Sequence, residues 1–324
     1  MFESILSSLT PISLVFELLA LALSFYLKDS RIFFIALALL CLRGVYAYAS
    51  LLQAHLFVSL FAPFVFVLFV VMKKTALVFE RKNLSKLAVL GFVGILALIL
   101  SKSTNFNAAM SESLFELPFE PVSELSLVFF AAECVFLVLW GIFKAEMHFT
   151  AAFALLFVQF LSQNLLSYSF FEFASLFFVI YLIYHSYKSL YFDTFTKLPN
   201  QKALKRRLLG LDDFYLGGLR MSGFEDLNLK DERVLLKKIG KILRKQRAQI
   251  FRVDGDFIFI FEGLDENAAS AFLQGIKQGL ENTNLSLKNK TIKLKISSTL
   301  MKNKAKFEEN LMTLKEDLAP IKRD

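Results

Sequence analysis

Long apolar runs separated by short polar connections fill the first 187 residues of the chain. Seven runs are long and apolar enough to cross a bilayer core of about 30 Å as helices. They lie at 11–27, 32–49, 55–72, 87–101, 124–143, 148–166 and 169–186. The pattern predicts a membrane domain of about seven transmembrane helices over residues 1–187. Six or eight spans remain alternatives, because the fourth run is short and the last two nearly touch.

From residue 188 onward the pattern changes to shorter amphipathic segments. Helical and alternating periodicities predict helix, strand, helix, strand, strand, helix, strand and helix. These segments cover 200–211, 214–221, 232–246, 249–254, 256–262, 267–282, 291–301 and 307–319. The two central strands are joined through Asp254-Gly255, which is typical of a tight hairpin turn. This order predicts an α+β, ferredoxin-like domain over residues 188–324.

Composition and charge indicate which side of a membrane each part occupies. The chain is 56% hydrophobic, contains 38 Phe, and carries a net charge of +8 that falls almost entirely beyond residue 187. Short cytoplasmic connections are enriched in Lys and Arg. The connections with Lys28 and Arg31, with Lys73 to Lys86, and with Lys144 are therefore predicted to be cytoplasmic, and the Glu-rich connection from 102 to 124 to be outside. This pattern predicts a multi-pass protein of the inner membrane with its C-terminal domain in the cytoplasm.

The cysteine content and the charge pattern limit the expected cofactors and partners. Cys41 and Cys134 lie inside apolar runs, so neither a disulfide framework nor a CxxC metal site is expected, and no cofactor or metal is predicted. The basic excess of the C-terminal domain lacks an aromatic platform or a recognition-helix pattern. Nucleic acid is therefore not an expected partner, whereas membrane lipid is.

Three segments, at 193–204, 219–228 and 252–261, resemble motifs of the GGDEF family of diguanylate cyclases. The segment DTFTKLPNQKAL, from Asp193 to Leu204, resembles the motif that opens the family's domain. The segment RVDGDFIFIF, from Arg252 to Phe261, resembles its R-x-G-G-[DE]-E-F hairpin, and LRMSGFEDLN resembles its first-strand motif, with Phe224, Leu227 and Asn228 in register. The resemblance covers about residues 190–300 and implies a domain related to those that join two GTP molecules into cyclic di-GMP.

Several positions of those motifs depart from the family. That chemistry needs metal ions on the triphosphate, and hard carboxylate oxygens must hold them. Arg220 and Ser222 occupy the two first-strand acidic positions, and Phe257 replaces the Glu of the hairpin. Asp256 keeps its acidic position. The motif positions that bear on activity, whether retained or altered, are Arg220, Ser222, Asn228, Asp254, Gly255, Asp256 and Phe257.

These departures predict a degenerate GGDEF-like domain with no catalytic residues assigned. The predicted function is membrane-bound signalling through a cytoplasmic protein partner or through sensing of a guanine nucleotide, with a homodimer formed along the linker around HSYKSLYFD. Asn228 is either a remaining guanine contact or an ordinary helix cap. An active diguanylate cyclase that makes cyclic di-GMP from GTP is an alternative.

A transporter-like membrane protein with a regulatory tail is the other alternative. It depends on intramembrane polar residues, which indicate functional sites by default. Those residues are Glu17, Arg43, Glu133 and Glu172. They are few and scattered, so pairing of Arg43 with Glu17 or Glu133 between helices is the simpler interpretation.

Adjacent strands would bring Arg220 next to Asp256, because a ferredoxin-like sheet places the first strand beside the hairpin. We predict a planar, two-pronged ion pair in which the guanidinium replaces a metal ion. If this pair is partly exposed, Arg220→Ala should cost only about 0.2–1 kcal/mol.

Overall fold

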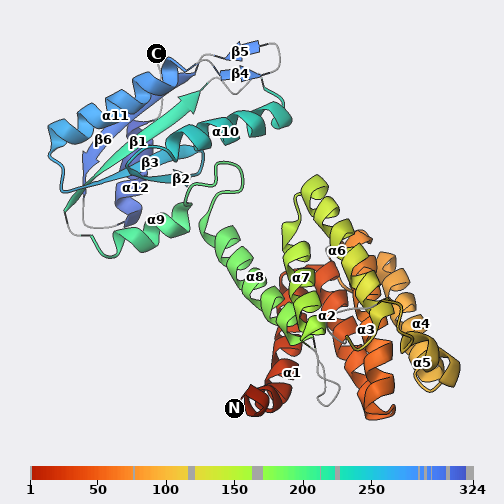
Figure 1. Ribbon diagram of the computed structural model, residues 1–324. Coiled ribbons are helices and arrows are strands. Elements are labelled where there is room, and N and C mark those ends of the chain that lie inside the picture. The colour runs from red at the N-terminus through yellow and green to blue at the C-terminus, as the bar shows by residue number, and fades with distance from the viewer. Residues whose placement is uncertain are drawn as a thin grey trace. The chain divides into compact units, whose positions relative to one another are not determined.

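The computed structural model of the protein describes residues 2–75, 77–115, 121–162, 171–211, 213–222, 227–283, 285–287, 290–292, 294–303 and 307–318. The chain divides into two compact units, Met1–Ser186 and Tyr187–Asp324, called here the N-terminal and the C-terminal unit (Figure 1). Each has its own apolar core.

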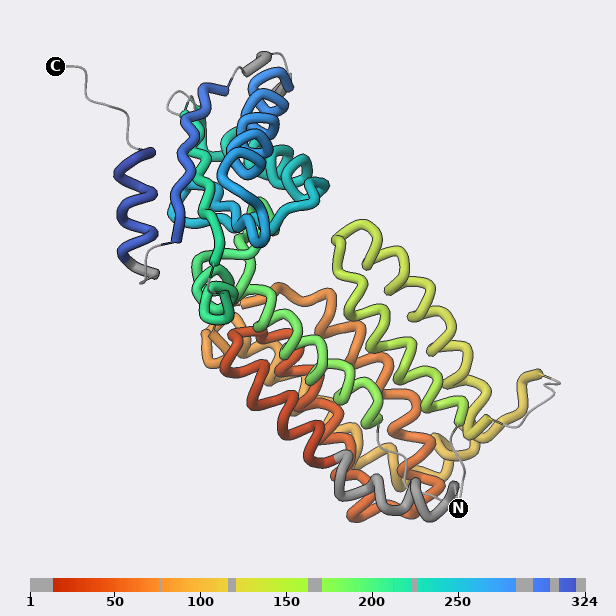
Figure 2. The backbone as a smooth tube through the Cα atoms, turned by 90° about the vertical axis from the view of Figure 1, so that its left-hand side faces the viewer, coloured from red at the N-terminus to blue at the C-terminus, as the bar shows by residue number. Residues whose placement is uncertain are grey.

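The N-terminal unit is a bundle of helices that run alternately up and down (Figure 2). Neighbours in the chain, α1 with α2, α2 with α3 and α6 with α7, pack together, and α3 also contacts α6. Two short 3-10 turns, η1 (Gly44–Ala47) and η2 (Arg81–Asn83), follow α2 and precede α4. The helices are α1 (Phe2–Tyr26), α2 (Ser30–Arg43), α3 (Leu51–Val71), α4 (Leu84–Leu100), α5 (Thr104–Met110), α6 (Glu124–Lys144), α7 (Met147–Leu161) and α8 (Glu172–Tyr191).

Four helical segments within the described residues are long and apolar enough to cross a membrane. They are Ser30–Ala47, Leu51–Val71, Arg81–Leu100 and Glu124–Lys144, and two shorter apolar helices cover Leu14–Tyr26 and Met147–Leu161. A helix lies at each of the seven predicted positions; within the described residues, the assessed part of α1 and the whole of α7 are apolar but shorter than these four segments, and α8 is not among them. The multi-span helical class is thus supported by four candidate spans, and the count of seven stays a prediction.

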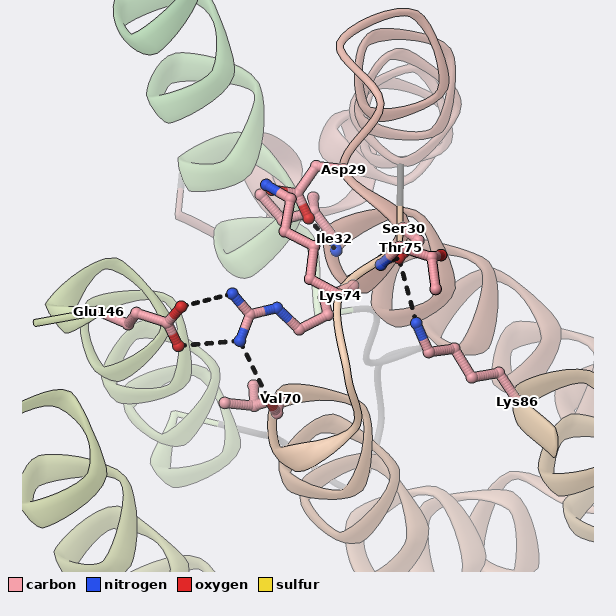
Figure 3. Close-up of polar contacts among 9 residues, drawn as sticks. Asp29, Ser30, Ile32, Val70, Lys74, Thr75, Lys86 and Glu146 are labelled. Carbon is pink, nitrogen blue, oxygen red and sulfur yellow. Dashed lines mark hydrogen bonds and ion pairs between the residues drawn. The ribbon is translucent and has the colours of Figure 1, made fainter. Parts of the chain in front are cut away.

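The three basic connections lie in contact at one end of this bundle (Figure 3). Arg31, at the start of α2, donates to Glu146 between α6 and α7, and Asp29 pairs with Lys74 after α3. The acidic connection is separate from them, with the Glu124 carboxylate accepting from the backbone N–H groups of residues 114 and 115. Glu116 and Glu120 fall outside the described residues. The antiparallel course of the helices therefore segregates basic from acidic connections, as the predicted topology requires.

The C-terminal unit is built on a four-stranded antiparallel sheet with the strand order β2-β3-β1-β6. Helices α10 and α11 cover one face through one apolar cluster, and α9 and α12 cover the other through a second. Its elements are α9 (Gln201–Leu208), β1 (Phe214–Ser222), α10 (Leu229–Leu243), β2 (Gln249–Val253), β3 (Asp256–Glu262), α11 (Glu266–Glu281), β4 (Leu285–Leu287), β5 (Lys290–Ile292), β6 (Lys295–Lys302) and α12 (Phe307–Asp317).

Two consecutive glycines let helices approach both faces of β1. A Cβ atom on Gly217 would lie 2.8 Å from the Phe261 ring and 3.2 Å from Leu273 of α11, and one on Gly218 would lie 2.7 Å from Leu318, just after α12. Because successive residues of a strand point to opposite faces, one glycine serves each side. The central strand is therefore closely packed on both faces.

The last predicted strand is wrong in one respect. The apolar alternation over 291–301 predicts one strand, but the structure divides it between β5 and β6. The β5 part pairs with β4 in a separate two-stranded sheet, with Leu285 opposite Ile292. Pairing partners distant in sequence decide where a strand ends, and alternation by itself does not show them.

Candidate functional site

The acidic hairpin forms the tight turn that Asp-Gly predicts. Val253 of β2 pairs with Asp256 of β3, so only Asp254 and Gly255 connect the strands. Their φ angles are 46° and 102°, which places both in the left-handed region. A two-residue turn with both φ angles positive matches the right-handed twist of the flanking strands. The turn thereby fixes Asp256 as the first residue of β3, next to β1.

Arg220 and Asp256 form the predicted ion pair. Arg220 Nε donates to Asp256 Oδ1 at 2.8 Å, and Arg220 Nη2 donates to Asp256 Oδ2 at 2.7 Å. The register explains their meeting, because Leu219 of β1 lies opposite Phe257 of β3. The side chain of Asp256 is 6% exposed and that of Arg220 is 31% exposed. These hydrogen bonds to the carboxylate raise the pKa of the guanidinium above its ordinary value.

Phe257 packs against a second arginine. The guanidinium carbon of Arg252, its cross-strand neighbour on β2, lies 4.3 Å from the centre of the Phe257 ring. Burial lowers the pKa of Arg252, while the nearby carboxylates of Asp193, Asp256 and Glu232 oppose that shift. Arg252 Nη1 is buried and makes no hydrogen bond within the described part of the chain. Position 257 therefore carries an aromatic ring that contacts a cation, where the family resemblance implies a carboxylate.

The other hairpin acid, Asp254, pairs with the last helix. Lys315 of α12 donates to Asp254 Oδ2 at 2.6 Å. Both side chains reach solvent, so the pair contributes little stability, typically about 0.2–1 kcal/mol. Both acids of the hairpin are thus engaged by cations of this chain.

Two further motif positions have local structural roles. Asn228 caps α10, because its Oδ1 accepts from the backbone N–H groups of Lys230 at 3.1 Å and Asp231 at 2.9 Å. Of the two roles considered for Asn228, a guanine contact and a helix cap, these hydrogen bonds are those of a helix cap. The hydroxyl of Ser222, at the end of β1, donates to the backbone oxygen of Lys295. Phe224 lies outside the described residues.

The motif that opens the C-terminal unit forms a compact turn. Asp193 Oδ1 accepts from the Thr196 backbone N–H at 2.7 Å and from its hydroxyl at 2.6 Å. Asn200 then caps α9 by accepting from the N–H groups of Lys202 and Ala203. The Pro199 carbonyl accepts from the Arg252 N–H at 2.7 Å, which ties this turn to β2. These contacts fix the position of the turn relative to the hairpin.

The polar residues predicted to lie inside the membrane are only partly paired. Arg43 pairs with Glu17 at 3.2 Å, which confirms one of the two predicted pairings. Glu133 Oε2 and Glu172 Oε2 are buried and make no hydrogen bond within the described residues. Cys41 and Cys134 are free thiols.

The site does not fit a divalent metal ion of the kind that the family resemblance implies. A hard cation needs several oxygen ligands, and the first-strand positions supply a guanidinium and a hydroxyl instead of carboxylates. Both oxygens of Asp256 accept from Arg220. No group of three or more metal-ligating side chains occurs among the residues that the structure describes.

Sequence reasoning missed the cations on either side of the central pair. In the sequence, Lys315 falls within the helix expected over 307–319 and Arg252 within the hairpin motif, and neither position by itself indicates these contacts. Their contacts arise from tertiary packing of α12 and from pairing of β2 with β3. The alternating pattern of RVDGDF, in which Arg252 and Phe257 flank a two-residue turn symmetrically, was the available signal for the second contact.

Solved structures that resemble this chain are GGDEF domains. The FimX GGDEF domain from Pseudomonas aeruginosa is 18% identical, with 40% of this chain and 91% of that chain covered and a TM-score of 0.36. The coiled coil and GGDEF domain of DgcB from Caulobacter crescentus, in complex with c-di-GMP, is 14% identical, with 43% of this chain and 83% of that chain covered and a TM-score of 0.38.

A third similar structure is the diguanylate cyclase SiaD in complex with its activator SiaC, from Pseudomonas aeruginosa. It is 13% identical, with 43% of this chain and 60% of that chain covered and a TM-score of 0.38. No protein-family model matches the sequence, and no curated protein matches it. At these identities and TM-scores, the roles of individual residues rest on the geometry of this chain.

Proposed function

We propose that this chain is a membrane-bound signalling protein whose GGDEF-like C-terminal unit does not synthesise cyclic di-GMP and acts instead by protein contact or as a sensor of a guanine nucleotide. The observation that carries the proposal is the two-pronged ion pair between Arg220 and Asp256. It lies where the resemblance implies a metal ion between two carboxylates.

The ion pair opposes phosphoryl-transfer chemistry for two reasons. Positioning and metal electrostatics supply most of that catalysis, and a guanidinium repels the cation that would do so. Its fixed charge also satisfies the carboxylate without any nucleotide. Phe257 removes a further carboxylate, and its ring packs against Arg252. Each loss is severe, and together they favour a signalling role over a catalytic one.

An exposed apolar stripe on α8 supports the homodimer. Ile180, Ile183, Tyr187 and Leu190 are exposed on this helix. Their spacings of three, four and three residues match the seam of a two-stranded coiled coil. A second copy of the chain would cover this stripe and align the two C-terminal units. In this proposal α8 carries a signal from the inner membrane to a cytoplasmic protein partner by shifting between two arrangements of the dimer.

The test is a turnover and binding assay on the full-length chain in lipid nanodiscs. With GTP and Mg²⁺ we expect no cyclic di-GMP above the background of empty nanodiscs, while an active diguanylate cyclase in the same nanodiscs serves as the positive control. Turnover that is lost in Asp256→Ala would contradict the proposal.

Calorimetric titration of the same samples with GTP and with cyclic di-GMP separates the two forms of the proposal. Saturable binding of either nucleotide, with no turnover, supports a sensor. No binding of either supports action by protein contact alone. Weaker binding in Arg220→Ala than in Asp256→Ala would show that Arg220 holds a phosphate in preference to the carboxylate.

A further inference from the structure

A cavity of about 210 Å³ opens at the basic end of the N-terminal unit, where the connections of Figure 3 meet. Its charged lining residues are Asp29, Arg31, Lys74 and Glu146. They come from the α1–α2, α3–α4 and α6–α7 connections, and α8 closes the remaining side. We infer that this cavity binds the phosphate group of a small phosphorylated ligand.

Arg31 is held rigidly in the wall. Its Nη1 and Nη2 donate to the two oxygens of Glu146 at 2.8 and 2.5 Å, and Nη1 also donates to the Val70 carbonyl at 3.3 Å. This fork keeps the pKa of Glu146 below its ordinary value, so the carboxylate stays ionised. Arg31 Nε is buried and has no hydrogen-bond partner in the described structure. Arg31 thus supplies a fixed positive charge beside the cavity, and Glu146 positions it.

Lys74 is the cation that can form an ion pair with a bound anion. It pairs with Asp29, yet its side chain is 48% exposed. Asp29 does not depend on this pair, because its other oxygen accepts from the Ile32 N–H and caps α2, where the helix dipole favours a negative charge. If Lys74 turns to an anion in the cavity, Asp29 keeps its hydrogen bond to the start of α2.

Three polar aromatic side chains also line the cavity, together with two leucines. His148 of α7 stacks on Tyr181 of α8, with ring centres 4.3 Å apart and planes 4° apart, and His185 lies 5.8 Å from Tyr181 along the same helix. Within the described residues, the imidazole nitrogens and the phenol of these three side chains have no hydrogen-bond partner. His185 is exposed and the other two side chains are half-buried, so water can satisfy these groups, and an anion in the cavity can accept their hydrogen bonds in its place.

Phosphate suits this set of donors better than a carboxylate does. Lys74, His148, Tyr181 and His185 can donate from several directions, and a phosphate offers three acceptor oxygens where a carboxylate offers two. The cavity of about 210 Å³ is many times the space that one water molecule needs, which leaves room for a phosphate with a small substituent. The same chemistry is available from a free phosphomonoester or from a lipid headgroup at the end of the helices.

Occupancy of the cavity would act on α8. Tyr181 and His185 belong to this helix, which continues to Tyr191, beyond the end of the N-terminal unit at Ser186. A ligand that draws both side chains toward Lys74 would favour one position of α8 over another. This last step rests on the proposed signalling function. The binding step does not, so a binding measurement can succeed even if the signalling proposal fails.

The experiment measures binding to the full chain in maltoside micelles. Inorganic phosphate and glycerol 3-phosphate are titrated by calorimetry, and retention of phosphatidic acid from mixed micelles is measured by native mass spectrometry. Lys74→Gln should weaken binding about tenfold or more, because it removes a charged donor. Tyr181→Phe should weaken it about threefold to tenfold. The matched control is Lys82→Gln, which removes the same charge from a residue on the same connection that is 70% exposed and should leave binding unchanged.

Each outcome decides the inference. Saturable binding of a soluble phosphate that Lys74→Gln weakens identifies a free ligand. Binding of phosphatidic acid alone, with the same dependence on Lys74, identifies a lipid headgroup. No saturable binding in either arm, or equal effects of Lys74→Gln and Lys82→Gln, would overturn the phosphate site.

Discussion

Replacing Arg220 with alanine should destabilise the C-terminal unit more than replacing its partner Asp256. In Arg220→Ala the carboxylate of Asp256, whose side chain is only 6% exposed, loses both of its charged donors. Leaving a buried charged acceptor unpaired costs about 1–3 kcal/mol or more, and we expect about 2 kcal/mol, or roughly a thirtyfold change in the folding equilibrium. This exceeds the range of about 0.2–1 kcal/mol expected for an exposed pair.

The reverse substitution should cost less. In Asp256→Ala the guanidinium of Arg220, which is 31% exposed, can turn its donors to water. We expect a loss of about 1 kcal/mol or less, and the double variant should be no less stable than Arg220→Ala. Urea unfolding of the fragment Tyr187–Asp324, followed by circular dichroism, measures all three free energies. A loss below about 0.5 kcal/mol for Arg220→Ala, or a larger loss for Asp256→Ala, would refute this account of the buried carboxylate.

Three further outcomes are expected. Reporter fusions after Lys82 and after the last residue should report the cytoplasm, and a fusion in the acidic connection should report the outside; a C-terminus outside would overturn the topology. The contact with Arg31 lowers the pKa of Glu146 in the folded state below its ordinary value of 4.5. This contact therefore stabilises the fold above that pH, and the stabilisation is lost as the pH falls through the folded-state pKa. Glu146→Gln should make the stability of the full chain less dependent on pH in this acidic range. Gly240→Ala should destabilise the C-terminal unit by about 2 kcal/mol, because the added Cβ atom would lie 2.4 Å from a backbone oxygen. The control Gly275→Ala, which has open space around it, should be neutral or slightly stabilising. Equal effects of the two substitutions in urea unfolding would contradict this.

Local chemistry in the sequence was sufficient for the parts of the fold that depend on near neighbours. The Asp254-Gly255 turn follows from the tolerance of these two residues for positive φ angles, and the structure has that turn. The four-stranded sheet follows from alternating segments of suitable length. The apolar runs likewise predicted the helices of the N-terminal unit, because an apolar stretch must be helical to satisfy its backbone in lipid.

Sequence order also predicted one long-range contact at the candidate site. The order of elements placed β1 beside β3, and this adjacency was sufficient to bring Arg220 to Asp256. It was not sufficient to show how deeply the carboxylate is buried, because burial depends on the helices that cover the sheet. The energetic consequence of the pair therefore depends on tertiary packing.

The tertiary structure alone decided which distant groups meet at the end of the helical bundle. Arg31 and Glu146 are 115 positions apart in the sequence. Their side chains form an ion pair only because the antiparallel helices place both connections at the same end of the bundle. The stack of His148 on Tyr181 and the division of the last predicted strand have the same origin. Periodicity reports which face of an element is apolar, but the partner across that face is set by packing of the whole chain, which no local pattern encodes.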